Sequence, residues 1–156
     1  MDHKQYMQEA VTAALKGMQN NEGGPFGCVI VKDGKIIGKG NNKVTSTNDP
    51  TAHAEVTAIR DACKNLGSFQ LEGCILYTSC EPCPMCLGAI YWARPEKVYY
   101  GSTKTDAAHI GFDDDFIYEE LKFPYADRSI PFEQLAPEVA ITPFQEWATK
   151  EDKTEY

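Results

Sequence analysis

The chain has 156 residues, 42% of them hydrophobic, with 23 acidic and 15 basic side chains and a formal net charge of −8. This length and composition suffice for one domain with its own core. The acidic balance repels phosphate backbones and no Lys/Arg cluster interrupts it, so no nucleic-acid partner is expected. No stretch is long and apolar enough to span a membrane, and no hydrophobic signal segment precedes the first helix. We therefore expect a cytoplasmic chain whose six cysteines are reduced.

Apolar periodicity and turn residues predict helices and strands that alternate along the chain. The predicted helices are 4–18, one opening at His53, 83–92, 114–122 and one from Pro143. The predicted strands are 26–32, 35–40, 74–79, 97–101 and 131–135, and Asp33-Gly34 between the first two is a strong hairpin signal. This order predicts a single α/β domain over 1–156. Its expected architecture is a three-layer α/β/α fold, with a mixed five-stranded sheet and helices on both faces.

Two short motifs, His53-Ala54-Glu55 and Pro82-Cys83-Pro84-Met85-Cys86, carry the chemistry. One imidazole and two thiolates are ligands that zinc prefers, and three protein ligands leave the fourth position to water or hydroxide. Glu55 adds what a structural zinc site does not need, because hydrolysis requires a group that carries protons. The motifs thus indicate a hydrolytic zinc site.

The spacing places both motifs at helix ends. Residues two apart within a helix point to nearly opposite sides, so His53 and Glu55 are expected in a first turn, with the metal off the end of the helix. Cys83 and Cys86 are three apart, which puts them on one face of a helix that Pro84 can begin. A helix N-terminus lowers the pKa of nearby thiols and favours thiolate ligands.

Cys80 leaves an alternative open, because it lies three residues before Cys83 and could close a structural Cys3His site. It ends a predicted strand, however, and Glu81 and Pro82 separate it from the helix. We interpret Cys80 as a small apolar residue packed near the site.

Residues 1–110 resemble the cytidine-deaminase-like zinc deaminase superfamily, in which H-x-E and P-C-x-x-C form the signature. Within it, the chain is most similar to the small bacterial guanine deaminases. The segments that carry this resemblance are Gly24-Pro25-Phe26-Gly27, 48–55, 78–86, 89–93, Gly111-Phe112-Asp113-Asp114 and the final Tyr156. The first three of these segments are partly shared with cytosine and tRNA adenosine deaminases, so the guanine prediction depends mainly on the latter half.

The resemblance implies one Zn²⁺ per subunit, held by His53, Cys83 and Cys86, and hydrolysis at C2 of guanine to xanthine and ammonia in purine metabolism. Glu55 would protonate the ring nitrogen beside C2, and Asp114 would assist the leaving amine.

The resemblance also implies a binding site for the purine base. Asn42 would hydrogen-bond the base, Phe26 would stack on it, and Ala54 would offer backbone polar groups. A homodimer is implied too, in which the segment 137–156 is exchanged with, or reaches, the partner subunit, so that Tyr156 helps close the site.

Each of these residues has a simpler interpretation. Asn42 suits a turn, Phe26 a core, Asp114 a helix cap and Tyr156 a disordered end. The rival functions are a deaminase of another base or amine (cytosine, a nucleoside, a pterin, a triazine), a tRNA adenosine deaminase, and a non-catalytic zinc protein.

Overall fold

The computed structural model describes residues 2–156, and its internal contacts divide the chain into two compact units, Met1–Asp114 and Asp115–Tyr156. The first unit contains the whole sheet and both motifs. Its helices are α1 (His3–Gln19), α2 (Val44–Thr47), α3 (Ala54–Leu66), α4 (Pro84–Ala93) and α5 (Lys104–His109). Its strands are β1 (Gly27–Lys32), β2 (Lys35–Asn41), β3 (Cys74–Cys80) and β4 (Lys97–Ser102). Every element predicted within the first hundred residues is therefore present.

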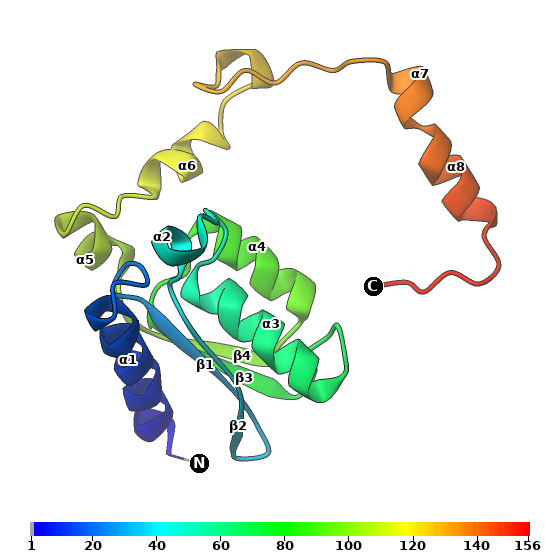
Figure 1. Cartoon of the computed structure of the whole chain (residues 1–156). Coiled ribbons are helices and arrows are strands. Elements are labelled where there is room, and N and C mark those ends of the chain that lie inside the picture. The colour runs from blue at the N-terminus through cyan, green and yellow to red at the C-terminus, as the bar shows by residue number, and fades with distance from the viewer. Residues whose placement is uncertain (1) are drawn as a thin grey trace. The chain divides into compact units, whose positions relative to one another are not determined.

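The sheet has the order β2-β1-β3-β4 (Figure 1). β1 pairs antiparallel with both β2 and β3, whereas β3 and β4 run parallel. Asp33 and Gly34 both have positive φ, 49° and 76°, as the tight hairpin between β1 and β2 requires. The mixed sheet, with a parallel part beside an antiparallel hairpin, is confirmed.

Helices cover both faces of the sheet, because alternate residues of each strand point to opposite sides. Cys28 and Ile30 of β1 pack in a cluster with residues of α3 and α4. Val29 and Val31 pack on the other side, with Ala10 of α1. The three-layer prediction is thus confirmed for the first unit.

A seam of small residues brings α3 close to the hairpin. A Cβ on Gly40 would lie 2.4 Å from the carbonyl oxygen of Ala54 and 2.5 Å from the amide nitrogen of Ala58. Gly38 is equally close to Ala58 and Ala62 one turn further on. α3 begins directly after His53 and carries Glu55 in its first turn. The close approach of α3 to the hairpin therefore fixes how near these two side chains lie to the sheet.

We expect Gly40→Ala to lower the free energy of unfolding by about 1–3 kcal/mol, because backbone atoms of α3 must move to admit the methyl group. Gly88→Ala is the matched control. Gly88 lies in α4 with no atom within 4 Å of an added Cβ, so alanine there should stabilise by roughly 0.5–1 kcal/mol. Urea unfolding of both variants measures the difference, and equal stability of the two would show that the seam does not hold α3.

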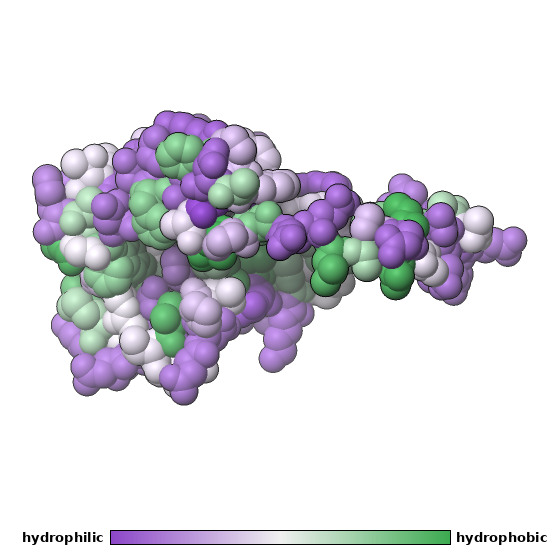
Figure 2. Space-filling model, turned by 90° about the horizontal axis from the view of Figure 1, so that it is seen from above, coloured by the Kyte–Doolittle hydropathy of each residue, from purple (hydrophilic) through white to green (hydrophobic). Residues whose placement is uncertain are grey.

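The second unit consists of short helices and irregular chain. Its elements are α6 (Asp115–Glu120), a 3-10 turn (Tyr125–Asp127), α7 (Pro137–Ala140) and α8 (Thr142–Thr149). The predicted helices at 114–122 and after Pro143 are therefore present. None of residues 115–156 is buried, and twelve large apolar side chains among them are exposed. Figure 2 shows hydrophobic residues at the molecular surface among hydrophilic ones.

The prediction of a fifth strand at 131–135 was wrong, and the sheet formed by the described residues 2–156 has four strands. Residues 131–135 have no regular structure. Pro131 has no amide hydrogen to give to a ladder. Phe132 and Leu135 are three apart, which does not match the two-residue period of a strand with one buried face.

None of the helices in the part of the chain that the structure describes combines the length and apolarity needed to cross a membrane.

Candidate metal centre and substrate pocket

The metal-binding side chains lie at the N-termini of two neighbouring helices. His53 is the N-cap of α3 and Cys83 is the N-cap of α4, both with extended backbone. Pro84 takes the first helical position of α4, as predicted, and the Cys86 amide donates to the Cys83 sulfur at 3.5 Å. The chain therefore reaches the site from the open ends of both helices, where amide groups have no partner within the helix.

The three side chains fit a zinc ion. Nδ1 of His53 lies 3.5 Å from Sγ of Cys83 and 3.5 Å from Sγ of Cys86. A tetrahedral zinc with ordinary bond lengths holds a nitrogen and a sulfur about 3.6 Å apart. Among the residues that the structure describes, these three are the only group of possible ligands gathered in this way. The predicted ligand set is thus brought together in a geometry that zinc would adopt.

The thiols are electrostatically unequal. The pKa of Cys83 is lowered, first by a hydrogen bond from the Cys86 thiol and also by the His53 imidazole. The pKa of Cys86 is raised, because it shares its proton with Cys83 and is buried. The hydrogen bond with Cys83 raises the pKa of His53. Two adjacent sulfurs competing for one proton form a site that a divalent cation stabilises, since it replaces the proton and allows both to be thiolates.

Cys80 is not a member of the ligand group. It is buried, 8% exposed, and its thiol contacts the carbonyl oxygen of Thr103 at 3.6 Å. Burial raises its pKa to about 11, which disfavours the thiolate form that zinc binds. The geometry supports the interpretation of Cys80 as a packing residue and an open, three-ligand metal centre.

Glu55 lies directly behind the ligands and is 6% exposed. Its Oε1 accepts a hydrogen bond from the Thr78 hydroxyl at 3.0 Å, and its Oε2 accepts one from the Cys86 thiol at 3.3 Å. Burial raises the pKa of Glu55 from its ordinary value. A carboxylate that takes up protons more readily than usual, beside a metal centre, is suited to proton transfer.

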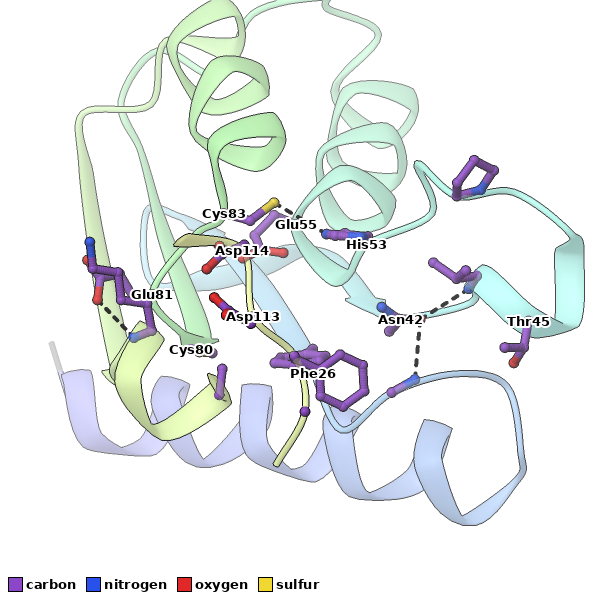
Figure 3. Close-up of a pocket in the computed structure, with 17 residues that line it drawn as sticks. Phe26, Asn42, Thr45, His53, Glu55, Cys80, Glu81, Cys83, Asp113 and Asp114 are labelled. Atoms are coloured by element: carbon purple, nitrogen blue, oxygen red, sulfur yellow. Dashed lines mark hydrogen bonds between the residues drawn. The ribbon is translucent and has the colours of Figure 1, made fainter. Parts of the chain in front are cut away.

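A cavity of about 470 Å³ opens in front of the metal centre. His53, Glu55 and Cys83 line it, as do Asn42 and Phe26 (Figure 3). The cavity is large enough for a purine base. A ligand in the cavity would therefore meet two of the metal-binding side chains and Glu55.

Asn42 is held in one orientation. Its Oδ1 accepts from the amides of Gly24, at 3.3 Å, and Val44, at 3.1 Å. The oxygen is thus occupied by backbone, and the Nδ2 amide hydrogens remain for a ligand. Asn42 is 6% exposed and lines the cavity, so it is not a surface turn residue.

Phe26 lines the cavity and packs partly against the core. Phe112 meets it edge-to-face, with ring centroids 4.9 Å apart. The core and stacking interpretations of Phe26 are therefore compatible, because the same ring serves both.

Asp114 lines the same cavity, and Figure 3 shows it close to Cys83 and Glu55. Burial raises the pKa of Asp114, and the charge of Cys83 adds to the effect. Asp113 also lines the cavity but is more exposed. Asp114 is thus the least exposed member of the acidic triplet, and its role in the reaction stays a prediction.

Two predicted substrate contacts are not among the cavity-lining residues of the first unit. Ala54 is completely buried at the start of α3, between two residues that do line it. Tyr156 belongs to the second unit and is 70% exposed. Their roles stay predictions.

The sequence reasoning assigned no role to several residues that line the cavity. Further lining residues are Val44, Thr45, Pro50, Glu81, Lys104 and Ala107. Lys104 and Ala107 lie on α5, a helix that was not predicted although its signal is present: Thr103 and Asp106 form a capping box. The Glu81 carboxylate accepts from the Lys104 amide at 3.0 Å, which ties the start of α5 to the loop before Cys83.

Residues 1–102 match the family model described as the cytidine and deoxycytidylate deaminase zinc-binding region. The chain belongs to this family of zinc-dependent deaminases, and the centre formed by His53, Cys83 and Cys86 is its zinc site.

Two groups of relatives are informative. The chain is 60% identical over 156 residues to a guanine deaminase of Bacillus subtilis, covering 100% of both chains. The X-ray structure of guanine deaminase from Bacillus subtilis superposes with a TM-score of 0.97, at 60% identity, covering 100% of this chain and 99% of that one. A tRNA-specific adenosine deaminase of Aquifex aeolicus is 42% identical over 102 residues, 65% of this chain and 67% of that protein. The similarity that extends through the second unit is therefore to guanine deaminases.

Proposed function

We propose that this protein is a zinc-dependent guanine deaminase that hydrolyses guanine to xanthine and ammonia. The observation that carries the proposal is the buried Glu55 carboxylate beside a three-ligand zinc site at the end of a purine-sized cavity. The full-length similarity to a guanine deaminase supports the choice of base.

When bound, zinc lowers the pKa of a coordinated water towards about 7 and so supplies hydroxide at neutral pH. Glu55 would accept a proton from the attacking water and deliver it to the ring nitrogen beside C2 of guanine. Its place next to Cys86 and its raised pKa suit both steps, because the group must accept and then release a proton.

Asp114 acts on the departing amine. The 2-amino group of guanine is conjugated with the ring and leaves well only after protonation. A carboxyl whose pKa is raised by burial, on the cavity wall near the metal ligands, can bring or hold that proton. Two carboxyl groups then divide the proton transfers, with Glu55 serving the ring and Asp114 serving the amine.

Asn42 and Phe26 hold the base. Because Oδ1 of Asn42 is occupied by two backbone amides, Asn42 meets the substrate as a donor and favours a base with an acceptor at that edge. The Phe26 ring, fixed by Phe112, offers a face for stacking. Guanine has acceptors on its carbonyl oxygen and ring nitrogens, so it matches this requirement. Ala54 is proposed to add backbone polar groups at the start of α3.

Asn42→Ala is expected to raise KM for guanine by roughly 10- to 100-fold, with a smaller change in kcat, because a hydrogen bond to the base is lost. The variant also removes the acceptor for two backbone amides, so its stability must be measured as well. Asn41→Ala is the matched control, since the neighbouring Asn41 donates to the Glu22 carboxylate and does not line the cavity. An unchanged KM in a folded Asn42→Ala protein would rule out this contact.

We further propose a homodimer in which the segment 137–156 is exchanged with, or reaches, the partner subunit. In this proposal residues 1–156 form one deaminase domain, of which 137–156 is the last part. The second unit supports this, because its large apolar side chains are exposed in a single chain. Large apolar side chains left exposed in this number are more typical of an interface than of a solvated surface.

Mixed dimers test whether Tyr156 acts on the partner. One subunit carries Tyr156→Ala with an intact centre, and the other carries Glu55→Gln with an intact Tyr156. If Tyr156 acts across the dimer, the mixed dimer regains one competent site and the lower KM of the wild type. Activity no higher than that of the Tyr156→Ala homodimer would place Tyr156 in its own subunit, and a monomer in light scattering would remove the proposal altogether.

A cytoplasmic location is proposed because all six cysteines are free, including the pair, Cys83 and Cys86, that zinc requires in reduced form. Alkylation of intact cells with a membrane-permeant maleimide, followed by mass spectrometry, should find no disulfide in the chain.

The substrate is tested by competition. Guanine, cytosine, adenine, guanosine and cytidine are offered together to the zinc-loaded protein, and the rate for each is compared with the Glu55→Ala blank. Guanine should be consumed first by a wide margin. Preference for cytosine, a nucleoside or another amine would keep the zinc chemistry and change the substrate, whereas tRNA adenosine is disfavoured by the net charge of −8.

A further inference from the structure

Three buried polar or charged side chains occur among the described residues: Asn42, Glu55 and Thr78. Two of them have been placed in the site. Thr78 is the third, 1% exposed, and it belongs to neither motif. Burying a hydroxyl is costly unless it is hydrogen-bonded, so the position of Thr78 calls for an explanation.

Thr78 lies where the fold would accept an apolar residue. It sits within β3, paired with Cys28 of β1 on one side and Tyr100 of β4 on the other. Cys74 and Leu76, four and two residues earlier on the same face, are completely buried in the cluster beneath α3 and α4. By this pattern a valine would fit the sheet as well, so the hydroxyl is not needed for packing.

The hydroxyl of Thr78 donates its hydrogen bond to Glu55. It donates to Oε1 at 3.0 Å, and a hydroxyl has one proton to give. The other carboxylate oxygen, Oε2, lies beside Cys86 on the metal side. Once Cys86 is a zinc thiolate it has no proton to donate, and Thr78 then remains the side-chain donor that holds the carboxylate.

We infer that Thr78 is the positioning residue of the proton carrier: its hydroxyl holds Oε1 of Glu55 against the sheet, so that Oε2 faces the metal centre and the substrate. The inference rests on the proposed function, because it concerns the residue that carries protons there. A carboxylate held at one oxygen from a rigid central strand keeps a single orientation, and a small misplacement of a reacting group costs much rate.

The test compares Thr78→Val, which keeps the shape and removes the hydroxyl, with Thr78→Ser, which keeps the hydroxyl. Thr78→Val should lower kcat by roughly 10- to 100-fold with KM for guanine within about threefold of wild type, since the base contacts are intact. Thr78→Ser should restore kcat to within about threefold of wild type. Zinc content and thermal unfolding are measured on each protein. Because the zinc ligands are unchanged, each variant should bind zinc like the wild type.

Ser79→Ala is the matched control. Ser79 is the next residue of β3, on the opposite face, and its hydroxyl accepts from the Gly27 amide at 3.0 Å. Its loss removes one hydroxyl from the same strand without touching Glu55, so kcat should stay within about twofold of wild type. A fall in kcat equal to that of Thr78→Val would assign the effect to the strand rather than to the hydrogen bond.

Crystal structures of the zinc-loaded variants give a readout that does not depend on activity. Glu55 should be displaced in Thr78→Val and remain in place in Thr78→Ser. A folded Thr78→Val protein with wild-type kcat and Glu55 in place would overturn the inference, as would equal losses in the Val and Ser variants. If the wild type itself turns over no base, the proposed function fails, while the position of Glu55 in the two structures still decides the role of Thr78.

Discussion

Glu55→Gln lowers kcat for guanine by about 10²–10⁴-fold while the protein stays folded and zinc-loaded; this is the expected result, because the amide keeps the shape of the side chain and cannot carry a proton. Glutamine can still accept the Thr78 hydrogen bond through its side-chain oxygen, so the packing behind the metal centre is preserved. KM should change much less than kcat, since Glu55 acts in the transition state and the base is held elsewhere.

Glu81→Gln is the control for removing a negative charge from the same cavity. Glu81 lines it, and its carboxylate bonds the Lys104 amide, a contact that the glutamine oxygen can keep. We expect its kcat within about fivefold of wild type. Steady-state kinetics on both variants with measured zinc content decide the matter. Substantial activity in Glu55→Gln would mean that another group carries the proton.

His53→Ala is the second large effect. Nδ1 of His53 is the only nitrogen in the ligand group, 3.5 Å from each sulfur, and its loss leaves two thiols to hold the metal. We expect most of the zinc to be lost at micromolar protein, and activity to fall at least about 10³-fold, because a water with an unperturbed pKa of 15.7 replaces an activated one. Atomic absorption on the dialysed protein measures the first effect and ammonia release the second.

Cys80→Ala distinguishes the open centre from a closed one. Cys80 is outside the ligand group and its thiol meets the Thr103 carbonyl oxygen. The variant should keep one zinc per subunit and activity within about threefold of wild type, with a modest loss of stability from the small cavity. Loss of zinc in Cys80→Ala would indicate a fourth protein ligand and would favour a structural site.

The metal centre could be predicted from the sequence because its geometry is local. The i, i+2 spacing of His53 and Glu55 requires a helix end, and both His53 and Cys83 are indeed N-caps. Pro84 predicts the start of the second helix, because proline has no amide hydrogen and the first helical position does not need one. The hairpin at Asp33-Gly34 could also be predicted from local sequence, because its turn needs left-handed backbone at both positions and these residue types favour it.

The surroundings of the centre could not be predicted in this way, because they depend on pairings between distant segments. Thr78 meets Glu55 across 23 positions of sequence, and the orientation of Asn42 is set by the Gly24 and Val44 amides. One signal was available: Thr78 is a polar residue at a position where the alternation of Cys74 and Leu76 favours an apolar one.

The second unit was predicted least well. Its apolar residues follow no steady helix or strand period, and none is buried within a single chain. A strand was predicted at 131–135 from local composition, yet a strand forms only where a neighbour supplies hydrogen bonds. The residues of such a segment do not specify which surface it packs against. Its role was therefore inferred from the resemblance.

The most direct test of the central claim, hydrolysis at C2 of guanine, is turnover in water enriched in oxygen-18. One labelled oxygen should enter each xanthine at C2, with one ammonia released per guanine, and both should vanish in Glu55→Ala. Xanthine without label, or no release of ammonia from guanine by the zinc-loaded wild type, would contradict it.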